Sequence, residues 1–281
     1  MKQKHILAVH DISCMGRCSL TIALPVISAA GITVSVMPTA VLSTHTGGIE
    51  GYTYRDLTGD MLSIADHWQK IGDYPPFDAI YTGYLGSRQQ LEIVAELVSR
   101  FRGENTQIII DPVMADHGKL YSGFSADFPQ GMAKLCKCAD VMTPNITEAL
   151  LMLGKEYKEG PYTREYIEDI LKNLAYKDRK IVLTGVYFSE EGKGYGAAAY
   201  DKGKIYFAFD EKIPGNYHGT GDLFASVLTA ALVNGNTLEQ AVKAAVKFTA
   251  ASIKRTYETK TDVRYGVNFE AGLKDLSGYL V

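Results

Sequence analysis

Short apolar segments alternate with longer segments of helical periodicity along most of this chain, and this alternation restricts the fold more than any other sequence feature. The apolar segments are HILAVHD (5–11), ITVSVMP (32–38), FDAIYTG (77–83), TQIIIDP (106–112), ADVMTP (139–144) and KIVLTG (180–185). Strands buried on both faces have such continuous apolar runs, and helical crossovers connect parallel strands. The pattern therefore predicts an α/β fold with a mostly parallel sheet and helices on both faces.

Two amphipathic helices are expected between these strands. Their apolar positions are Tyr54, Leu57, Met61, Ile64, Ala65 and Trp68 in the first helix, and Leu91, Val94, Ala95, Val98 and Phe101 in the second. Residues with this spacing lie on one side of a helix, so both helices should pack on the sheet.

The pattern changes after Thr184. The segments GAAAYD (196–201) and KIYFAF (204–209) flank a short turn, which predicts an antiparallel hairpin at one edge of the sheet. Two helices follow, with apolar faces formed by Leu223, Phe224, Val227, Leu228, Ala231 and Leu232, and by Ala241, Val242, Ala245, Val246, Ala250 and Ile253. No internal repeat, low-complexity segment or linker interrupts the chain, so we expect a single domain over residues 1–281.

Charge and cysteine content argue against several classes of protein. The formal net charge is −3 and no long run of Lys or Arg occurs, so a nucleic-acid partner is not expected. No apolar segment approaches the ~20 residues of a membrane span, and the N-terminal segment lacks a signal-peptide pattern. We therefore expect a cytoplasmic protein without membrane association. Cys14, Cys18, Cys136 and Cys138 match no common zinc or disulfide spacing and are expected to be reduced structural thiols.

Polar residues lie at the end of almost every predicted parallel strand or follow it. In chain order they are His10, Asp11, Thr82, Tyr84, Asp111, Asn145, Glu148 and Thr184, the last of them followed by Gly185. In an open parallel sheet, ligands bind beyond the carboxyl ends of the strands. We therefore expect the functional site at this edge of the sheet.

The segment GTGD, residues Gly219, Thr220, Gly221 and Asp222, opens the first of the two C-terminal helices. Helix N-termini bind phosphate through their free amides, so a negatively charged side chain at this point needs an explanation. One interpretation is that Asp222 only caps the helix. The other is that the amides hold a transferring phosphoryl group while Asp222 accepts the proton of the attacking hydroxyl.

Two further segments carry hard oxygen ligands of the kind that a phosphoryl donor's metal ion prefers. They are DPVMAD, which begins with Asp111, and PNITE, which contains Asn145 and Glu148. Taken alone, the first is also a common turn and the second an ordinary helix start. Their occurrence together with GTGD favours the phosphoryl-transfer interpretation.

Other nucleotide and metal sites are not indicated. The chain has no G-x-x-x-x-G-K-[ST] segment, and GTGD lies too near the C-terminus for a dinucleotide fingerprint, which disfavours a dehydrogenase. No H-x-x-x-H or H-E-x-x-H pattern occurs, so a catalytic zinc site is not expected.

In this order and spacing, DPVMAD, TPNITEA, VLTG and HGTGD resemble the ribokinase-like superfamily, and specifically its branch of pyridoxal/pyridoxamine kinases and hydroxymethylpyrimidine kinases. The similarity extends along nearly the whole chain. VLSTHTGG (41–48) and YTGYLGS (81–87) are similar to the pyridoxal kinase segments that surround the vitamin ring, and this pair is more specific than GTGD. The resemblance implies a three-layer α/β sandwich that phosphorylates vitamin B6 with ATP.

The resemblance also implies roles for the residues that would contact the phosphate groups, the metal ion and the nucleotide. Asp222 would be the base for the 5′-hydroxyl, and the GTG amides would form an anion hole. Asp111 and Glu148 would organise Mg²⁺, directly or through water. The nucleotide side would further include Asn145, Thr184 and Gly185. A requirement for a monovalent cation is left open, and a homodimer is expected.

On the acceptor side, the implied residues are Asp11, Ser13, His45, Thr46 and Tyr84, with Asp116 and Tyr121 on a covering loop. Many pyridoxal kinases carry Ser where this chain has Asp11, so a carboxylate here would bind a ring hydroxyl or ring N–H.

The segment DISCMGRCS is similar to the pyrimidine kinases, which keeps hydroxymethylpyrimidine open as a substrate. Those enzymes commonly have Cys in place of Asp222, which argues for vitamin B6. A sugar kinase and a non-catalytic vitamin-binding protein of the same fold are the remaining alternatives.

Overall fold

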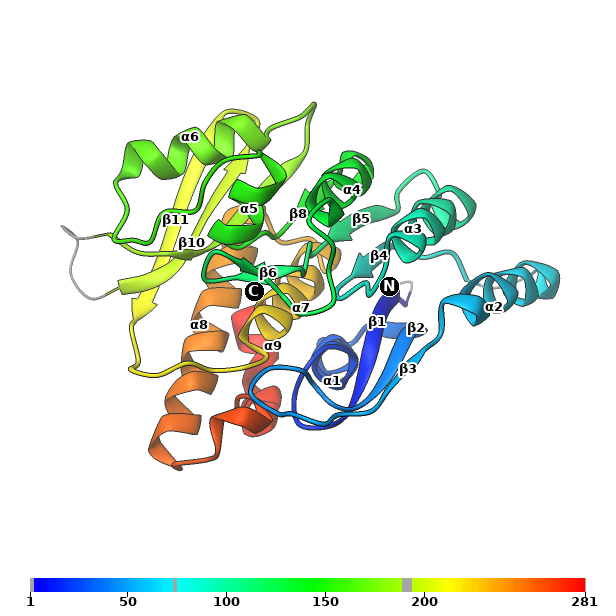
Figure 1. The fold of residues 1–281 in the computed structure, drawn as a ribbon, viewed down its shortest axis with the longest axis horizontal. Helices are drawn as coiled ribbons and strands as arrows, with labels where there is room; N and C mark the ends of the chain where they lie inside the picture. Colours follow the sequence, from blue (N-terminus) through cyan, green and yellow to red (C-terminus); the bar gives the residue numbers. More distant parts are fainter. Residues whose placement is uncertain (1–2, 73–74, 189–193, 281) are drawn as a thin grey trace.

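The computed structural model describes residues 3–72, 75–188 and 194–280. The strands of its main sheet are β1 (His5–Met15), β2 (Thr33–Thr44), β3 (Tyr54–Asp56), β4 (Ala79–Thr82), β5 (Gln107–Ile110), β8 (Val141–Met142), β9 (Lys180–Val186), β10 (Gly194–Asp201) and β11 (Lys204–Glu211). Within the described ranges they form nine strands in the order β11-β10-β9-β8-β5-β4-β1-β2-β3 (Figure 1). A separate hairpin consists of β6 (Ala115–Asp116) and β7 (Lys119–Leu120).

The middle of the sheet is parallel and its edges are antiparallel. Strands β2, β1, β4, β5, β8 and β9 pair in parallel, and each of them begins in one of the six predicted apolar segments, although β1 and β2 continue past theirs to Met15 and Thr44. At one edge, β10 and β11 form the expected antiparallel hairpin. At the other edge, β3 pairs antiparallel with β2. This strand was not predicted, because its three residues are exposed and carry no apolar run.

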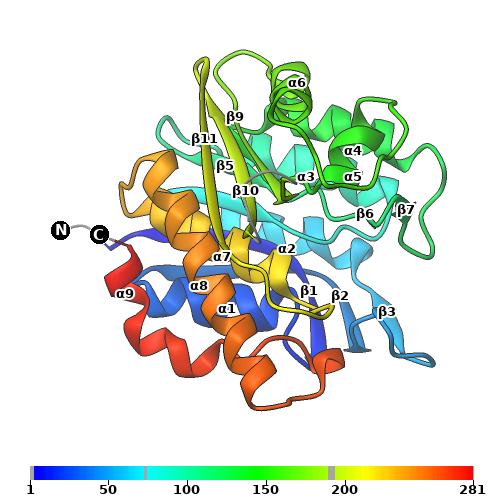
Figure 2. The same cartoon turned by 90° about the vertical axis from the view of Figure 1, so that its left-hand side faces the viewer.

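Helices cover both faces of the sheet and complete three layers (Figure 2). One face carries α2 (Thr58–Ile71), α3 (Arg88–Phe101), α4 (Phe128–Leu135), α5 (Ile146–Met152) and α6 (Arg164–Leu174), and the other carries α1 (Leu20–Ala29), α7 (Thr220–Val233), α8 (Leu238–Glu258) and α9 (Leu276–Tyr279). The short 3-10 helices are η1 (Cys136–Cys138), η2 (Val263–Tyr265) and η3 (Glu270–Asp275). A separate apolar core lies on each face of the sheet, which confirms the expected α/β sandwich.

The predicted helical face that starts at Tyr54 was wrong in its first two positions. Tyr54 belongs to β3, and Leu57 precedes the first turn of α2. The helix begins only at Thr58, whose N–H donates a 2.8 Å hydrogen bond to the Asp56 carboxylate. In the next helix, Ala95 is exposed rather than part of the packed stripe. The other four predicted positions of α3 are buried, together with Ile93 and Leu97.

The first strand continues past the point where the sequence pattern ends. Its pairing with β2 shifts register between His10 and Ile12, so Asp11 lies at an irregularity in the strand. Ile12 also pairs antiparallel with Ser19, which brings the chain back toward Asp11 just before α1. Within the described ranges, no helix is both long enough and apolar enough to cross a membrane.

Candidate active site

Asp222 lies in the first turn of α7, directly after the glycine pair. Gly219 is the N-cap of this helix and has a left-handed backbone, with φ 74°. A Cβ atom at this position would lie 2.3 Å from the carbonyl oxygen of Arg17, so only glycine fits. The close approach of Arg17 is a reason for Gly219 that is independent of phosphate binding.

Thr220 and Gly221 complete the start of α7. The Thr220 hydroxyl donates a 3.2 Å hydrogen bond to the Tyr217 carbonyl, which holds the loop before the helix. Gly221 is exposed, and a Cβ atom there would meet nothing within 4 Å. The N-terminus of α7 is therefore accessible from solvent at Gly221.

The Asp222 carboxylate contacts the turn that precedes α1. Its Oδ2 atom accepts hydrogen bonds from the Ser19 N–H (2.8 Å) and from the Cys18 thiol (3.3 Å). Within the described ranges, these are the hydrogen bonds that the carboxylate makes, and neither donor belongs to its own helix. An N-terminal cap would instead accept from a helix amide. Burial raises the pKa of Asp222, while Ser19, Cys18 and the nearby His45 oppose the shift.

The carboxylates of Asp11, Asp111, Glu148 and Asp222 converge at the carboxyl edge of the sheet. Asp11, Asp111 and Glu148 are 5% exposed or less. Burial is the main reason why their pKa values are raised, and it takes the pKa of Asp11 to about 6. The charge of Asp222 raises the pKa of both Asp11 and Asp111, and that of Asp111 raises the pKa of Glu148. Such a cluster of buried like charges favours a bound cation or bound protons.

Asn145 and Glu148 also have a structural task, because they cap α5 and tie it to the β6–β7 hairpin. They form a reciprocal capping box at the start of α5. The second Glu148 oxygen accepts from the Met114 N–H (3.0 Å), and the Asn145 amide donates to the Ala115 carbonyl (2.8 Å). The ordinary helix start that PNITE suggests is therefore real, and any role in metal binding is additional to it.

The β6–β7 hairpin and the residue after it lie against the carboxylate cluster. Burial, followed by the charges of Glu148, Asp116 and Asp222, raises the pKa of Tyr121. Asp116 itself is exposed on β6, and its carboxylate accepts from the N–H of His117 (2.8 Å). The structure thus brings Tyr121 and Asp116 to the side of the site that the sequence assigns to a covering loop.

His45 is held by the backbone through both ring nitrogens. Its Nε2 atom contacts the Arg264 carbonyl oxygen, and its Nδ1 atom accepts from the Gly47 N–H (3.1 Å). With both nitrogens engaged, the ring supports the loop after β2 and has no free nitrogen for a ligand. Thr46, the next residue, is exposed. The His218 ring lies 4.8 Å from the His45 ring, between centroids.

Asp11, Ser13 and Tyr84 lie together on the acceptor side. Ser13 donates a 3.3 Å hydrogen bond to Asp11 Oδ2. The buried Asp11 Oδ1 atom has no hydrogen-bond partner in the part of the chain that the structure describes. Burial, with smaller effects from Tyr54 and Asp11, raises the pKa of Tyr84, whose ring packs 5.6 Å from the Phe124 ring. A buried carboxylate oxygen beside a tyrosine ring suits an aromatic ligand that carries a hydrogen-bond donor.

Thr184 and Gly185 lie beside the start of α5. The Thr184 N–H donates to the Pro144 carbonyl (2.9 Å), which aligns Thr184 with Asn145. A Cβ atom at Gly185 would lie 3.4 Å from the Tyr195 hydroxyl. The predicted nucleotide residues from the ends of β8 and β9 are therefore neighbours.

Three residues of this region were not among the predicted site residues. Cys18 and Ser19 contact Asp222, and His218 contacts the His45 loop. All three lie in segments that the sequence analysis compared with known families, DISCMGRCS and HGTGD, but nothing in either segment indicated a contact with the carboxylate.

The donor set fits Mg²⁺ that is shared with substrate phosphates. Within the described ranges, no three His, Cys, Asp or Glu side chains group closely enough to hold a metal ion by themselves. Mg²⁺ in phosphoryl-transfer sites usually takes one or two carboxylates and completes its shell with water and phosphate oxygens. The buried carboxylates of Asp111 and Glu148 match that requirement.

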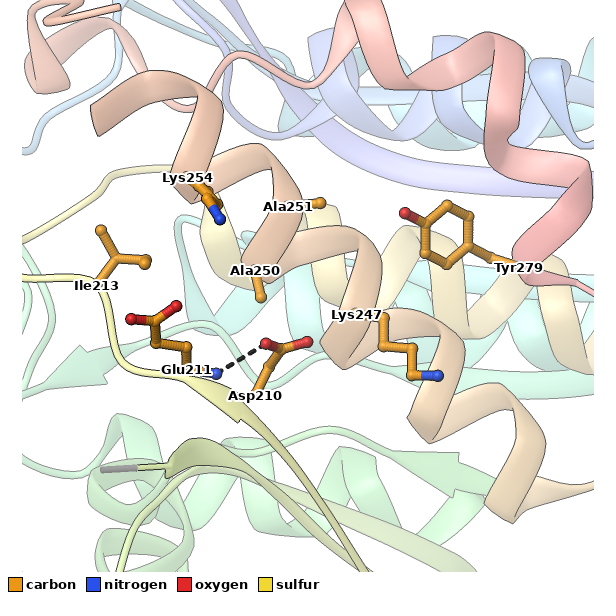
Figure 3. Close-up of a pocket in the computed structure, with 8 residues that line it drawn as sticks. All are labelled: Asp210, Glu211, Ile213, Lys247, Ala250, Ala251, Lys254 and Tyr279. Atoms are coloured by element: carbon orange, nitrogen blue, oxygen red, sulfur yellow. Dashed lines mark hydrogen bonds between the residues drawn. The ribbon is translucent and has the colours of Figure 1, made fainter. Parts of the chain in front are cut away.

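A cavity of about 290 Å³ lies elsewhere, between the end of β11 and α8 (Figure 3). It is lined by Asp210, Glu211, Ile213, Lys247, Ala250, Ala251, Lys254 and Tyr279. None of the predicted site residues lines it, so it is distinct from the carboxylate cluster.

Comparison with known proteins identifies the family. A sequence model of the family described as phosphomethylpyrimidine kinase matches residues 24–266. A Bacteroides thetaiotaomicron protein, provisionally named a phosphomethylpyrimidine kinase and crystallised with pyridoxal, is 38% identical with a TM-score of 0.91, covering 98% of this chain and 96% of that one. Pyridoxal kinase from Lactobacillus plantarum is 30% identical with a TM-score of 0.89, covering 99% and 98%. The pyridoxine/pyridoxal/pyridoxamine kinase of Bordetella avium is 27% identical, covering 89% of this chain and 85% of its own. The chain therefore belongs to the phosphomethylpyrimidine kinase family and has the ribokinase-like fold of the pyridoxal kinases.

Proposed function

We propose that this chain transfers the γ-phosphoryl group of ATP to the 5′-hydroxymethyl group of vitamin B6, with pyridoxal, pyridoxamine or pyridoxine as acceptor. The observation that supports this most is the position of Asp222. It is a carboxylate with a raised pKa in the first turn of α7, beside the buried carboxylates of Asp11 and Asp111. The pyridoxal in the crystals of the Bacteroides relative supports the choice of acceptor.

In this proposal the protein acts mainly by positioning. The amides of Gly219 to Asp222, at the positive end of the α7 dipole, would bind the transferring phosphoryl group. Asp222 would accept the proton of the acceptor hydroxyl as that hydroxyl attacks in line. A raised pKa makes the carboxylate a stronger base, closer to the pH at which the reaction runs.

Asp111 and Glu148 would hold Mg²⁺, directly or through water. When bound, the ion would neutralise negative charge on the phosphate oxygens of ATP. Asn145, Thr184 and Gly185 would lie along the nucleotide, and Asp116 and Tyr121 would lie on the loop that covers the site. On the acceptor side, Asp11 would bind a donor on the ring while Tyr84 and Thr46 line the pocket. His45 would support that pocket from behind.

A coupled ADP-release assay tests the proposal. Pyridoxal, pyridoxamine, pyridoxine and hydroxymethylpyrimidine are compared at equal concentration, with Mg²⁺ and with either K⁺ or Na⁺. We expect turnover with at least one vitamin B6 form and its loss when Mg²⁺ is chelated. Background ADP release with every acceptor would instead indicate a non-catalytic vitamin-binding protein.

Phosphorylation of hydroxymethylpyrimidine is the second candidate. The description of the matching family favours it. Asp222 argues against it, because the sequence pattern of the pyrimidine kinases commonly has Cys at this position. A kcat/KM for hydroxymethylpyrimidine well above that for every vitamin B6 form would establish this alternative.

We extend the proposal to the state of the protein in the cell. The family resemblance supports a homodimer, and the sequence pattern supports one kinase domain over residues 1–281 with a cytoplasmic location. Light scattering coupled to size-exclusion chromatography should then give twice the chain mass of 30.8 kDa. A mass of one chain would contradict the dimer without affecting the proposed reaction.

A further inference from the structure

The turn that precedes α1, residues 16–19, has an unfavourable backbone conformation at Ser19. This residue has φ 51° and ψ −125°. Such angles match the first central residue of a type II′ turn, a position where glycine predominates. A residue with a side chain keeps this conformation only where surrounding contacts enforce it, and such positions concentrate at functional sites.

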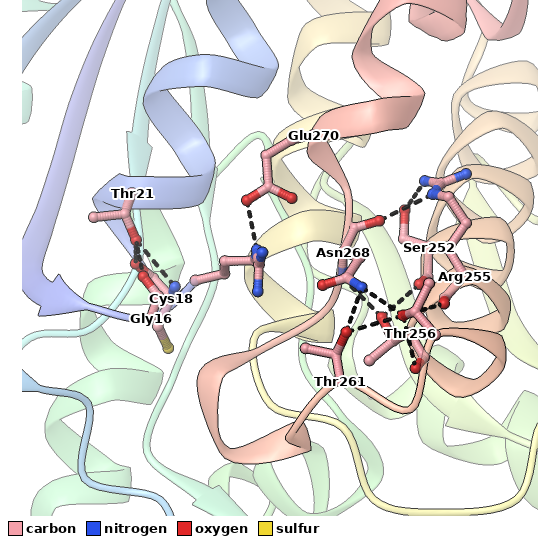
Figure 4. Close-up of polar contacts among 11 residues, drawn as sticks. Gly16, Cys18, Thr21, Ser252, Arg255, Thr256, Thr261, Asn268 and Glu270 are labelled. Atoms are coloured by element: carbon pink, nitrogen blue, oxygen red, sulfur yellow. Dashed lines mark hydrogen bonds and ion pairs between the residues drawn. The ribbon is translucent and has the colours of Figure 1, made fainter.

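Contacts on two sides hold the 16–19 turn in place (Figure 4). On one side, the Thr21 hydroxyl donates to the Cys18 carbonyl (2.7 Å) and accepts from the Cys18 N–H (3.1 Å). On the other side, the Arg17 N–H donates to the Tyr265 carbonyl (3.0 Å), and the Arg17 guanidinium pairs with Glu270 (2.5 Å). The turn is thus fixed both to α1 and to the C-terminal segment.

The fixed turn directs two donors at one oxygen of Asp222. The Ser19 N–H and the Cys18 thiol both bind Oδ2, at 2.8 Å and 3.3 Å. Ser19 also pairs with Ile12, next to Asp11, so the same turn contacts both the strand that carries Asp11 and the start of α7. Because both donors use Oδ2, the Oδ1 atom remains for another partner. In the proposed reaction that partner is the acceptor hydroxyl.

We propose that Cys18 and Ser19 are positioning residues that orient the Asp222 carboxylate, with Oδ2 held by the turn and Oδ1 directed to the acceptor hydroxyl. The inference rests on the proposed function, in which Asp222 is the base. A backbone N–H in an enforced conformation cannot rotate away, unlike a side-chain donor. Small errors in the placement of a base reduce the rate strongly, which explains why the conformational cost at Ser19 is retained.

The first test replaces the thiol. In Cys18→Ala, kcat should fall about fivefold to tenfold, the loss expected for a weak hydrogen bond to a charged group. The KM values for ATP and acceptor should stay within about twofold, because in this proposal the thiol acts on the Asp222 carboxylate and not on the substrates. Cys18→Ser supplies a hydroxyl donor and should recover most of the rate. Cys14→Ala, which removes an exposed thiol from the same segment, is the control and should match the parent.

A double-mutant cycle separates positioning from packing. If Cys18 acts through Asp222, Cys18→Ala should have no further effect on kcat in an Asp222→Asn background. An equal loss in both backgrounds would overturn the inference and leave Cys18 as a packing residue. The base assignment fails in a different way, through more than about a tenth of parental kcat in Asp222→Asn alone, and the proposed function fails through lack of turnover with every acceptor.

Ser19 is tested by its backbone requirement. Gly adopts the observed angles readily, whereas the β-branched Val does not. We expect Ser19→Gly to have a kcat at least about tenfold above that of Ser19→Val, and this difference should vanish in the Asp222→Asn background. Thermal melting identifies any variant that fails to fold, in which case the Cys18 cycle decides. Equal kcat for folded Gly and Val variants would contradict the role of the turn.

Discussion

Asn145 and Glu148 exchange two hydrogen bonds of 2.9 Å at the start of α5. The Glu148 N–H donates to Asn145 Oδ1, and the Asn145 N–H donates to Glu148 Oε2. Glu148 Oε1 accepts from the Met114 N–H at 3.0 Å. One buried carboxylate therefore caps a helix, anchors the segment before β6 and is the proposed Mg²⁺ ligand. Capping requires only acceptor oxygens, whereas holding a divalent ion requires charge, so the roles can be separated.

Glu148→Gln should shift the Mg²⁺ dependence of the rate to a severalfold higher concentration, because the substitution removes the charge that holds the ion. Gln can also complete a capping box. Its contact with the Met114 N–H is weaker, but no charge is buried any longer, so the free energy of unfolding should change little. The checks are rate curves against Mg²⁺ concentration and thermal melting. Asp111→Asn should shift the curve in the same direction. Curves that overlay the parent for both variants would show that these acids are structural.

Asp222→Asn should lower kcat by roughly 10² to 10⁴, the usual range for losing a positioned proton acceptor, with a near-normal KM for ATP. The amide keeps the size of the side chain and can still accept from Ser19. Steady-state kinetics on protein with a parental melting curve is the measurement. More than about a tenth of parental kcat would exclude Asp222 as the base.

Asp11→Asn should stabilise the protein at neutral pH. Burial raises the pKa of Asp11 to about 6 in the folded state, so between about pH 4 and pH 6 the folded state binds more protons than the unfolded chain. Above pH 6 the ionised carboxylate therefore lowers the free energy of unfolding. This effect disappears as the pH falls from the pKa of Asp11 in the folded state to its pKa in the unfolded chain. The gain should be at most about 3 kcal/mol at neutral pH and near zero at about pH 4.

Urea denaturation of the parent and of Asp11→Asn across this pH range measures the difference. Asp178→Asn is the matched control, because Asp178 is exposed in the loop before β9. Its difference from the parent at each pH measures the effect of the same Asp-to-Asn change at an exposed position. A constant gain for Asp11→Asn across the range would mean that Asp11 is not the titrating group.

Asp11→Ala should raise the KM for the acceptor by about tenfold while the KM for ATP stays nearly constant. The buried Oδ1 atom of Asp11 has no partner in the described part of the chain, and loss of a hydrogen bond to a charged group accounts for a change of this size. Tyr84→Ala should also weaken acceptor binding, by ~1 kcal/mol if its ring stacks on the acceptor. Equal changes for both substrates would remove Asp11 from the acceptor pocket.

Gly219→Ala should destabilise the protein by at least about 2 kcal/mol, because Gly219 has a positive φ and a Cβ atom would lie 2.3 Å from the Arg17 carbonyl. Gly221→Ala is the control for stability, since a Cβ atom there meets nothing within 4 Å. Denaturation curves compare the two. Equal stability losses would show that the Arg17 turn moves away from α7 at little cost.

The sequence predicted the parallel part of the sheet well because strands buried on both faces carry a strong local signal. Ile6, Leu7, Ala8 and Val9 of β1 are fully buried, and their apolar run is visible without a structure. The β6–β7 hairpin and β3 carry no such signal. They are two or three residues long, which is too short for a periodic pattern; β6 pairs with the adjacent β7, and β3 pairs with the edge of β2. Ala95 shows the same limit for helices, because a small apolar residue at the margin of a stripe packs or stays exposed according to its neighbours.

At the site, local sequence patterns were enough to identify Asp11, Asp111, Glu148 and Asp222 as candidates, although β1 continues to Met15 instead of ending at Asp11. How Asp222 is held depends on the tertiary structure. Its donors Ser19 and Cys18 lie 203 and 204 residues earlier in the chain, and their approach depends on how the turn before α1 packs against Gly219. The burial and mutual repulsion that raise the pKa values of these carboxylates also arise from packing. Contacts over such separations leave no periodic pattern in the sequence, because they are set by the arrangement of whole elements rather than by neighbouring residues.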